Sequence, residues 1–224
     1  MRMLLQLGFA LFPALVSAQG PATATAALLG PEELVRKITS DVLEAIKADK
    51  DLQAGDREKA LALAEAKVLP LIDFREMTKL AAGRNWTAAS GGQRDKLVDG
   101  FRSMLVRTYS NAIDVYRGQS LDVQPVRMSP KDDEVRVRNL YHSPGRPPIP
   151  VDYQMLKSPE GWKIYDIVVD GVSLVLTYRT EFEQEVRRNG IDGLIARMKE
   201  KNTPPSGRGP DAPKPGAAGA PPAR

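Results

Sequence analysis

The spacing of hydrophobic residues changes twice along this chain, and this change restricts the folds that the chain can adopt. Up to about Gly118, apolar residues recur every three or four positions, which is typical of helices that bury one face. From Leu121 to Ile164 they alternate with polar residues, as in strands that are covered on one side. After Gly171 the helical spacing returns. Helices, then strands, then helices again predict an α+β domain.

Four strands are predicted from this alternation, and the turns between them set their direction. The alternating apolar residues are Leu121 and Val123, Val135 and Val137, Val151, Tyr153 and Met155, and Trp162 and Ile164. The connections are rich in turn residues and lie at 129–133, 142–148 and 158–161. Connections this short are compatible only with antiparallel pairing. We expect helices packed on a strongly twisted antiparallel sheet of four to five strands, with an apolar pocket between them.

Six helices are predicted from the apolar spacing together with start and stop signals. Their ranges are 31–46, 56–69, 73–82, 90–118, 172–186 and 191–198. Pro31 begins the first at the position where its missing N–H is not needed. The longest begins at a capping box, in which Ser90 and Gln93 satisfy each other's backbone N–H groups. Gly118 is expected to end it.

The first eighteen residues have the three parts of a cleavable secretory signal. Arg2 gives the positive start, an apolar stretch follows from Met3 to Val16, and residues 16–18 present a short Val-Ser-Ala cleavage site. The alternative is a membrane anchor, but the apolar stretch is shorter than the roughly 18–20 residues that span a bilayer. We therefore expect cleavage after Ala18 and a protein that works outside the cytoplasm.

The remaining chain is expected to form one domain between two weakly structured ends. Residues 19–30 read as a flexible linker, 31–202 as the domain and 203–224 as a disordered tail. In that tail Pro, Gly and Ala make up 16 of 22 residues, which bury too little apolar surface to order it. The chain has no cysteine, so neither a disulfide framework nor a thiolate metal site is available.

Composition and motifs argue against nucleic-acid binding and against familiar catalytic sites. Arg2 and the tail hold three of the four net positive charges, so the domain is close to neutral and no nucleic-acid partner is expected. Phosphate-loop, dinucleotide and zinc-protease motifs are absent from the sequence. His142, the only histidine, falls in a predicted hairpin loop, while Asp166 and Asp170 fall at a strand end and a turn. We expect no catalytic residue, metal site or cofactor.

Three stretches of the chain resemble the MlaC family, also known as the toluene-tolerance auxiliary component of a phospholipid ABC transport system. They are residues 80–94, which include Ala82-Gly83-Arg84-Asn85-Trp86; residues 101–116; and residues 161–182, which begin Gly161-Trp162-Lys163-Ile164-Tyr165-Asp166. Residues 190–195 complete the resemblance, which spans 73–198. Gly91-Gly92, Pro147-Pro148 and the tail depart from the family pattern.

The resemblance implies an NTF2-like fold and a periplasmic phospholipid carrier that catalyses no reaction. Its expected partners are a phospholipid, an inner-membrane ABC lipid transporter complex and an outer-membrane lipoprotein–porin complex, and its expected role is to maintain outer-membrane lipid asymmetry. Two alternatives stay open. One is an NTF2-like enzyme acting on a small apolar ligand, which requires Asp166 or His142 to point inward. The other is a periplasmic lipoprotein or peptide chaperone.

The resemblance also suggests which residues meet the lipid. Those expected to contact acyl chains are Phe101, Met104, Leu105, Tyr109, Val137, Tyr153, Met155 and Ile167. The residue types alone favour an ordinary hydrophobic core for these side chains, and only the family pattern makes a pocket equally consistent. Arg84, Arg107 and Arg179 are candidates for the lipid phosphate, and the alternative for each is a structural ion pair with a nearby carboxylate.

Overall fold

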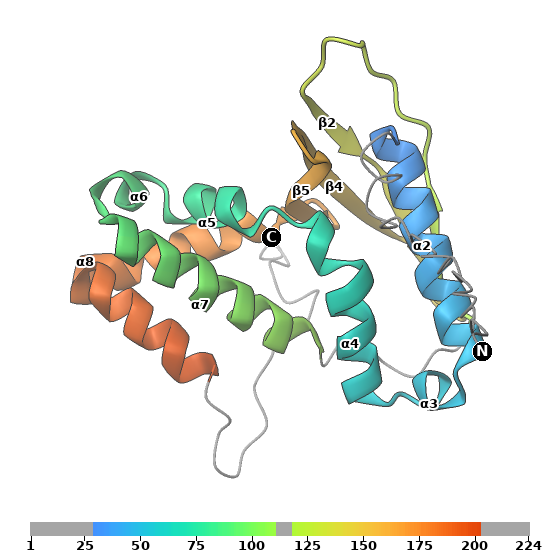
Figure 1. Cartoon of the computed structure of the whole chain (residues 1–224), viewed down its shortest axis with the longest axis horizontal. Helices are drawn as coiled ribbons and strands as arrows, with labels where there is room; N and C mark the ends of the chain where they lie inside the picture. The colour runs from blue at the N-terminus through green and yellow to red at the C-terminus, as the bar shows by residue number, and fades with distance from the viewer. Residues whose placement is uncertain (1–28, 111–117, 203–224) are drawn as a thin grey trace, which may run out of the picture.

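The computed structural model describes residues 29–110 and 118–202 (Figure 1). The predicted secretory signal, nearly all of the predicted linker and the predicted tail therefore lie outside the described residues. The described chain forms helices and an antiparallel sheet, which confirms the predicted α+β class. Within residues 29–110 and 118–202, no helix combines the length and the apolar character needed to cross a membrane.

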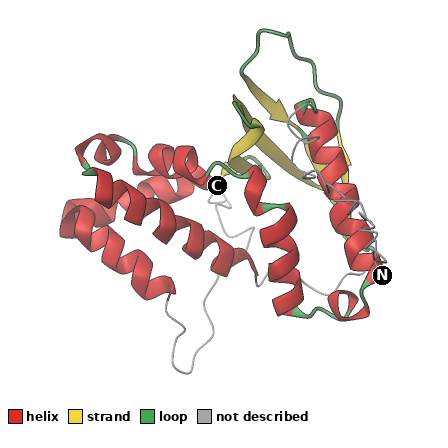
Figure 2. Cartoon of the chain, viewed as in Figure 1, coloured by secondary structure: helices red, strands yellow, loops and turns green. Residues whose placement is uncertain are grey.

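The helices divide between two regions of the molecule. Figure 2 shows α5, α6, α7 and α8 together on one side and the sheet with α2 on the other, with α4 between them. The helices are α2 (Pro31–Ala48), α3 (Lys50–Gln53), α4 (Arg57–Lys67), the 3₁₀ turn η1 (Leu69–Leu71), α5 (Phe74–Ala82), α6 (Arg84–Ala88), α7 (Gly91–Ser110) and α8 (Leu174–Asn202). Of these, α3 and α6 are short and were not predicted.

The sheet contains six strands, all paired antiparallel. They are β1 (Ser120–Val123), β2 (Glu134–Val137), β3 (Asn139–His142), β4 (Ile149–Ser158), β5 (Gly161–Val169) and β6 (Val172–Ser173). The order is β1-β3-β4-β5-β6, and β2 pairs with the second half of β4. A bulge between Gln154 and Met155 shifts the β4–β5 register. Such a bulge increases the local twist, so it favours a curved sheet that can partly enclose a ligand.

The predicted number of four to five strands was too low, because β3 and β6 were missed. Asn139 occupies an inward position of β3, where an apolar residue would have marked a strand. Its side chain is 1% exposed, and its amide donates to the main-chain oxygens of Val137 (3.0 Å) and Val151 (2.8 Å). The prediction also began a helix at Val172, but that residue lies in β6, and α8 begins at Leu174.

Three of the predicted helix starts are confirmed by capping contacts. Ser90 and Gln93 form the expected reciprocal pair, with the Ser90 N–H donating to Gln93 Oε1 (3.0 Å) and the Gln93 N–H to Ser90 Oγ (3.3 Å). The caps of α4 and α5 are not reciprocal: the Asp56 carboxylate accepts from the Lys59 N–H (3.0 Å), and the Asp73 carboxylate accepts from the Glu76 N–H (2.8 Å). The predicted helix end at Gly118 follows residues 111–117, which lie outside the described part of the chain.

The two predicted C-terminal helices are joined into α8, which bends at Gly190. Gly190 has φ 70° and ψ −178°, a combination that side-chain-bearing residues rarely adopt. Glu185 connects the two halves, because it accepts hydrogen bonds from Asn189 (2.5 Å) and from Arg197 (2.8 Å) beyond the bend. The bend lets the second half of α8 fold back along α7, where Leu194 and Met198 are buried.

The buried apolar side chains form two separate groups, which we call the helical core and the sheet core. The helical core consists of Met77, Ala81, Ala89, Leu97, Phe101, Met104, Leu105, Val175, Tyr178, Phe182, Leu194 and Met198. The sheet core consists of Leu34, Val35, Val123, Val137, Met155, Trp162 and Ile164. Phe101 is fully buried and meets Tyr178 and Phe182 edge-on, with ring centroids 5.0 Å apart in each pair.

Candidate binding cavity

A cavity of about 750 Å³ lies between α2, η1 and one face of the sheet. Ligand pockets commonly measure about 300–1,000 Å³, so this volume is large enough for an extended apolar ligand. The residues that line it are Val35, Ile38, Thr39, Val42, Leu43, Ile46, Val68, Leu71, Ile72, Gln119, Ser120, Leu121, Tyr141, Ser143, Pro144, Arg146, Ile149, Tyr153, Ile164 and Ile167. Most of these side chains are aliphatic, which favours an apolar occupant.

One wall of the cavity is α2, and the spacing of its apolar residues explains why. Ile38, Val42 and Ile46 are four residues apart, so they lie along one face of the helix. At the start of the helix, Leu34 and Val35 are almost fully buried in the sheet core. The first turns of α2 therefore attach the helix to the sheet, and its later turns present an apolar stripe to the cavity.

Polar contacts hold the start of α2 against the sheet. The Glu32 carboxylate accepts a hydrogen bond from the Val126 N–H (2.8 Å) and pairs with Arg36 (3.1 Å). Arg36 also donates to the main-chain oxygen of Val123 at the end of β1. The Val126 hydrogen bond, and after it the Arg36 contact, lowers the pKa of Glu32. These contacts fix the end of α2 that is remote from its cavity-lining turns.

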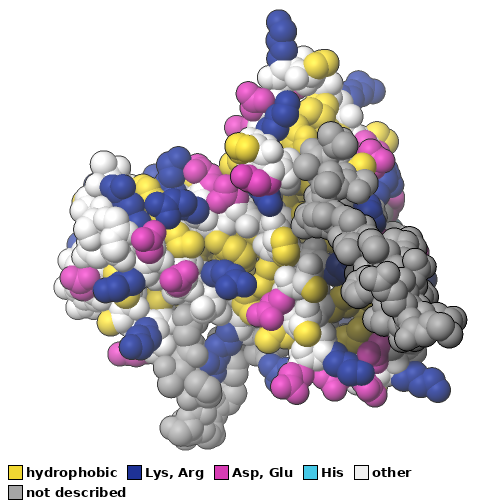
Figure 3. Space-filling view, viewed as in Figure 1, with side chains coloured by type: hydrophobic (Ala, Val, Ile, Leu, Met, Phe, Trp, Pro, Cys, Tyr) yellow, Lys and Arg dark blue, Asp and Glu magenta, His cyan; other side chains and the backbone are white. Residues whose placement is uncertain are grey.

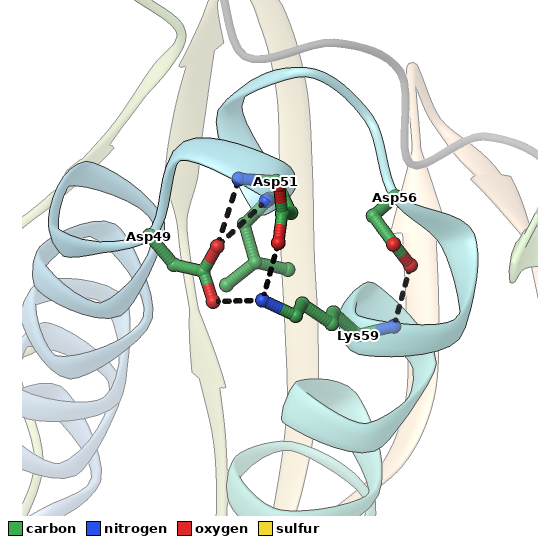
Figure 4. A network of polar contacts seen from close by, with 5 residues as sticks. Asp49, Asp51, Asp56 and Lys59 are labelled. Carbon is green, nitrogen blue, oxygen red and sulfur yellow. Dashed lines mark hydrogen bonds and ion pairs between the residues drawn. The ribbon is translucent and has the colours of Figure 1, made fainter.

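The corner from α2 through α3 to α4 is held by the carboxylates drawn in Figure 4. Asp49 caps α3 by accepting from the N–H groups of Asp51 (2.8 Å) and Leu52 (3.2 Å). The Lys59 ammonium group on α4 contacts both Asp49 (2.8 Å) and Asp51 (2.7 Å). The Lys59 hydrogen bond lowers the pKa of Asp49, and both carboxylates raise the pKa of Lys59. This corner sets the direction of α4 and so places η1 as a second wall.

The sheet forms the opposite wall. Ile149 and Tyr153 on β4 and Ile164 and Ile167 on β5 line the cavity, and Tyr153 lies directly opposite Ile167 in the strand register. Ile72, just after η1, forms a β-bridge with Ile164, which joins the second wall to the sheet. Burial raises the pKa of Tyr153, and its hydroxyl has no hydrogen-bond partner among the described residues. It is a single polar group on an otherwise apolar stretch of wall.

Polar residues gather at one end of the cavity. Ser120 on β1 pairs with His142, and Tyr141 on β3 pairs with Ile149, so the start of β1 and the β3–β4 hairpin lie together. This end contributes most of the polar lining, namely Gln119, Ser120, Tyr141, Ser143 and Arg146. The opposite end is closed by side chains of the sheet core, including Val35 and Ile164. The cavity is therefore apolar along its length and polar at the hairpin.

Four of the residues predicted to contact acyl chains belong to the sheet region. Tyr153 and Ile167 line the cavity. Val137 and Met155 lie in the sheet core, and neither has any exposed surface. The prediction therefore located the right face of the sheet for two of these side chains, and lipid contact by any of them stays a prediction.

The other four predicted contacts lie in the helical region, away from the cavity. Phe101, Met104 and Leu105 belong to the helical core. Met104 also lines a smaller hollow of about 220 Å³, whose other residues all come from α8 and include Glu181, Glu185, Arg188 and Arg197. Tyr109 is 45% exposed, and burial of the rest of the residue raises its pKa. The structure brings none of these four to the cavity.

The three predicted head-group arginines do not line the cavity either. Arg84 forms an ion pair with Glu183 on α8 (2.5 Å), which is the structural alternative that the sequence left open. The guanidinium of Arg179 lies against Gly83, where a Cβ would come within 3.1 Å of its Nε. Arg107, in the last turns of α7, is likewise absent from the lining residues.

Asp166 and His142, which the enzyme alternative requires, both lie outside the cavity lining. Asp166 is 8% exposed and accepts hydrogen bonds from the Ile167 N–H (2.8 Å), the Ser173 hydroxyl (2.5 Å) and the Val175 N–H (3.0 Å). Asp166 thereby provides an acceptor for the Val175 N–H in the first turn of α8. Neither Asp166 nor His142 lines the cavity. Among the described residues, histidine, aspartate and glutamate side chains form no cluster suited to a metal ion.

Most of the cavity lining that the sequence did not predict comes from α2, η1 and the β3–β4 hairpin. The apolar stripe of α2 was visible in the spacing of Ile38, Val42 and Ile46, but spacing does not show which surface a stripe faces. In the sequence, Arg146 is marked only as part of the turn predicted at 142–148. A signal was present, because it is an arginine in a loop that adjoins predicted strands with apolar faces.

Charged side chains of both signs are mixed on one face of the molecule (Figure 3). On the face drawn in Figure 3, lysine and arginine side chains are interspersed with aspartate and glutamate, and hydrophobic side chains gather near the centre. Nucleic-acid-binding domains usually concentrate basic residues on one face or along one helix. This face shows no such concentration.

Comparison with known proteins identifies relatives of this chain. It is 21% identical over 178 residues to the intermembrane phospholipid transport system binding protein MlaC of Haemophilus influenzae, covering 78% of this chain and 83% of that protein. It is 26% identical over 172 residues to the toluene tolerance protein ttg2D of Pseudomonas putida, covering 75% and 78%.

A solved structure gives the same fold. The phospholipid-binding protein from Ralstonia solanacearum, determined in complex with a phospholipid, matches with a TM-score of 0.68 and 38% identity, covering 75% of this chain and 94% of that one. The likeness to NTF2-like domains stays a prediction. The model of the family described as "MlaC protein" matches residues 36–200. These include the helical core, the sheet core apart from Leu34 and Val35, and the cavity lining apart from Val35. The chain belongs to the MlaC family.

Proposed function

We propose that this protein is a periplasmic carrier that holds the acyl chains of a phospholipid in the cavity between α2 and the sheet. In this proposal it passes lipid between an outer-membrane lipoprotein–porin complex and an inner-membrane ABC transporter complex and so maintains outer-membrane lipid asymmetry. The observation that carries the proposal is the cavity itself, whose lining is largely aliphatic and includes no carboxylate among the described residues.

The relatives support the same conclusion. One is named as the binding protein of an intermembrane phospholipid transport system, and the Ralstonia solanacearum structure contains a phospholipid. The predicted signal at residues 1–18 directs the chain out of the cytoplasm, as a periplasmic carrier requires. Together these observations favour a carrier in the space between two membranes.

Simple energetics explain why such a carrier needs an enclosed apolar cavity. Each methylene removed from water contributes ~0.8 kcal/mol, so about 25 methylenes on two acyl chains require roughly 20 kcal/mol of compensation outside a membrane. Aliphatic walls on α2, η1 and the sheet supply that environment.

The enzyme alternative has less support from the structure. It requires Asp166 or His142 to point into the cavity, and both are absent from the lining. The three hydrogen bonds to Asp166 come from β5, β6 and the start of α8. The chaperone alternative requires a surface that binds polypeptide, and the test below distinguishes it from a lipid carrier.

The direct test is to extract the protein, purified without added lipid, with organic solvent and to measure phosphorus and lipid mass. We expect roughly one phospholipid per chain. Val42→Glu places a carboxylate on the apolar stripe of α2, so the extracted lipid should fall at least fivefold while the fold is kept. Recovery of peptide without lipid from several preparations would favour the chaperone.

Val172→Glu is the matched control for this experiment. Val172 is 50% exposed on β6 and does not line the cavity, so the same change of residue type should leave the lipid content at the wild-type value. If both variants lose lipid equally, the loss reflects added charge or lower stability, and the assignment of the α2 stripe to lipid binding is wrong. Circular dichroism melting of both variants verifies that each is folded.

A further inference from the structure

The charged groups in the described cavity lining are of one sign only. Among the described residues that line it, Arg146 is the only one with a full charge, and there is no carboxylate. The other polar residues of the same end, such as Ser120, Tyr141 and Ser143, carry hydroxyl groups. An anionic group placed at this end would therefore meet one cation and several hydrogen-bond donors, with no opposing negative charge in the lining.

The local sequence fixes the position of Arg146. Ser143-Pro144-Gly145-Arg146 has proline and glycine at the two central positions, where a type II turn requires them, and Gly145 has φ +74°. The turn closes through the Arg146 N–H, which donates to the Ser143 main-chain oxygen (3.1 Å). Pro147 then restricts Arg146 itself to an extended conformation. The side chain therefore extends from a rigid turn and not from a flexible loop.

The guanidinium of Arg146 is available for a ligand. Arg146 is exposed, and within residues 29–110 and 118–202 its side chain has neither an ion pair nor a hydrogen bond. The three arginines that the sequence suggested differ from it, because none lines the cavity. An arginine guanidinium matches the geometry of a phosphate, which it binds through two parallel N–H groups.

We infer that the hairpin end of the cavity is a phosphate site, at which Arg146 binds the phosphodiester of a glycerophospholipid while its acyl chains lie along α2 and the sheet. This inference rests on the proposed function and adds the orientation of the lipid to it. From Ile149 to Met155, which is level with Ile164, β4 advances six residues, or about 20 Å. That length accommodates much of an extended acyl chain beneath a head group at the hairpin.

The test compares two lipids with the same acyl chains, phosphatidylglycerol and uncharged diacylglycerol, as ligands of the full chain after its own lipid has been removed. The wild-type protein should bind phosphatidylglycerol about fivefold or more tightly than diacylglycerol. Arg146→Gln should weaken phosphatidylglycerol binding about three- to tenfold and leave diacylglycerol binding unchanged. Arg146→Lys, which keeps the charge, should have an intermediate affinity.

Arg127→Gln is the matched control, because Arg127 is an exposed loop arginine that does not line the cavity. It should change neither affinity. Raising the salt concentration should weaken wild-type binding of phosphatidylglycerol only, which tests the site without any substitution. Inorganic phosphate at millimolar concentration should not compete measurably, since it lacks the acyl chains; strong competition would mean that the site binds free phosphate rather than a lipid head group.

Each outcome has a distinct meaning. If Arg146→Gln weakens both lipids equally, or weakens neither, Arg146 does not bind phosphate and the inference is wrong even though the carrier function stands. If the delipidated wild-type protein binds neither lipid, the proposed function itself fails. An affinity for phosphatidylglycerol that is independent of salt would also overturn the phosphate site.

Discussion

Single carboxylates in this protein act mainly on the backbone and on neighbouring cations, and Asp166 is the clearest case. Its two oxygens accept three hydrogen bonds at the junction of β5, β6 and α8. Asp166→Ala should lower the free energy of unfolding by about 2 kcal/mol, because the Val175 N–H and the Ser173 hydroxyl lose their acceptor. Urea denaturation measures this loss. A variant of unchanged stability that had lost function would instead support a catalytic Asp166.

Glu185 gives a pH-dependent prediction. The Asn189 hydrogen bond, aided by Arg197, lowers the pKa of Glu185 below its usual value near 4.5. A carboxyl whose pKa is lowered by folding stabilises the protein above the unfolded-state pKa, and that contribution is lost as the pH falls through the folded-state pKa. Glu185→Gln should therefore be less stable than wild type at pH 7, and the difference should shrink below about pH 4.

Urea denaturation of wild type and variant at pH 7 and at pH 3.5 checks this prediction. Glu183→Gln is the control on the same helix, since its ion pair with Arg84 is exposed and such pairs contribute about 0–1 kcal/mol. A Glu185→Gln difference that is the same at both pH values would show that the Glu185 contacts do not depend on its charge.

Residue types predicted burial better than they predicted function. Phe101 and Met104 were expected to be apolar and enclosed, and they are, but in the helical core. Periodicity identifies the buried face of an element, whereas the partner of that face depends on the tertiary arrangement. Which arginines border the cavity could not be predicted for the same reason. Arg84 and Arg146 are both exposed, and only the fold shows that Arg146 borders the cavity.

At the scale of elements, two of the three glycines in α7 have opposite expected effects on stability. Gly92 has open space where a Cβ would be, so Gly92→Ala should raise the free energy of unfolding by about 0.5–1 kcal/mol through helix propensity alone. A Cβ on Gly100 would lie 3.1 Å from both Cβ and Sδ of Met198 on α8. Gly100→Ala should therefore destabilise the protein, because α8 has to shift.

Thermal denaturation of the two alanine variants compares them directly, with each acting as the control for the other. Equal shifts of Tm in the same direction would contradict the close packing of α7 on α8. The result also bears on the departure from the family pattern at Gly91-Gly92, which the helix tolerates because the Ser90–Gln93 capping box stabilises the same turn.

Helices with a capping residue at their start were predicted well. Strand β3, which depends on the tertiary contacts of one buried side chain, was not. The caps at Asp56, Asp73 and Ser90 fixed three helix starts to within one residue. Strand β3 was missed because Asn139 interrupts the apolar alternation and replaces it with hydrogen bonds to two strands. No propensity rule assigns a buried asparagine to a strand, since its partners come from tertiary structure.

At the scale of the whole molecule, the two cores have different roles. The helical core is packed around Phe101, whose ring contacts Tyr178 and Phe182, and this packing favours a rigid helical region. The sheet core closes only one end of the space under α2, and the cavity continues from it towards the hairpin. The α+β class followed from the sequence, but the separation into two cores, and hence the location of the cavity, depends on how α2 and α4 are held by the corner at Lys59.

The central claim is that acyl chains lie between α2 and the sheet rather than in the helical core. A phospholipid with a photoreactive diazirine in the middle of one acyl chain, loaded into the full chain and irradiated, tests it by mass spectrometric mapping of the crosslinked residues. We predict crosslinks on Ile38, Val42, Tyr153 and Ile167, which line the cavity. Crosslinks concentrated on Phe101, Met104 and Leu105 would contradict the account and place the lipid in the helical core.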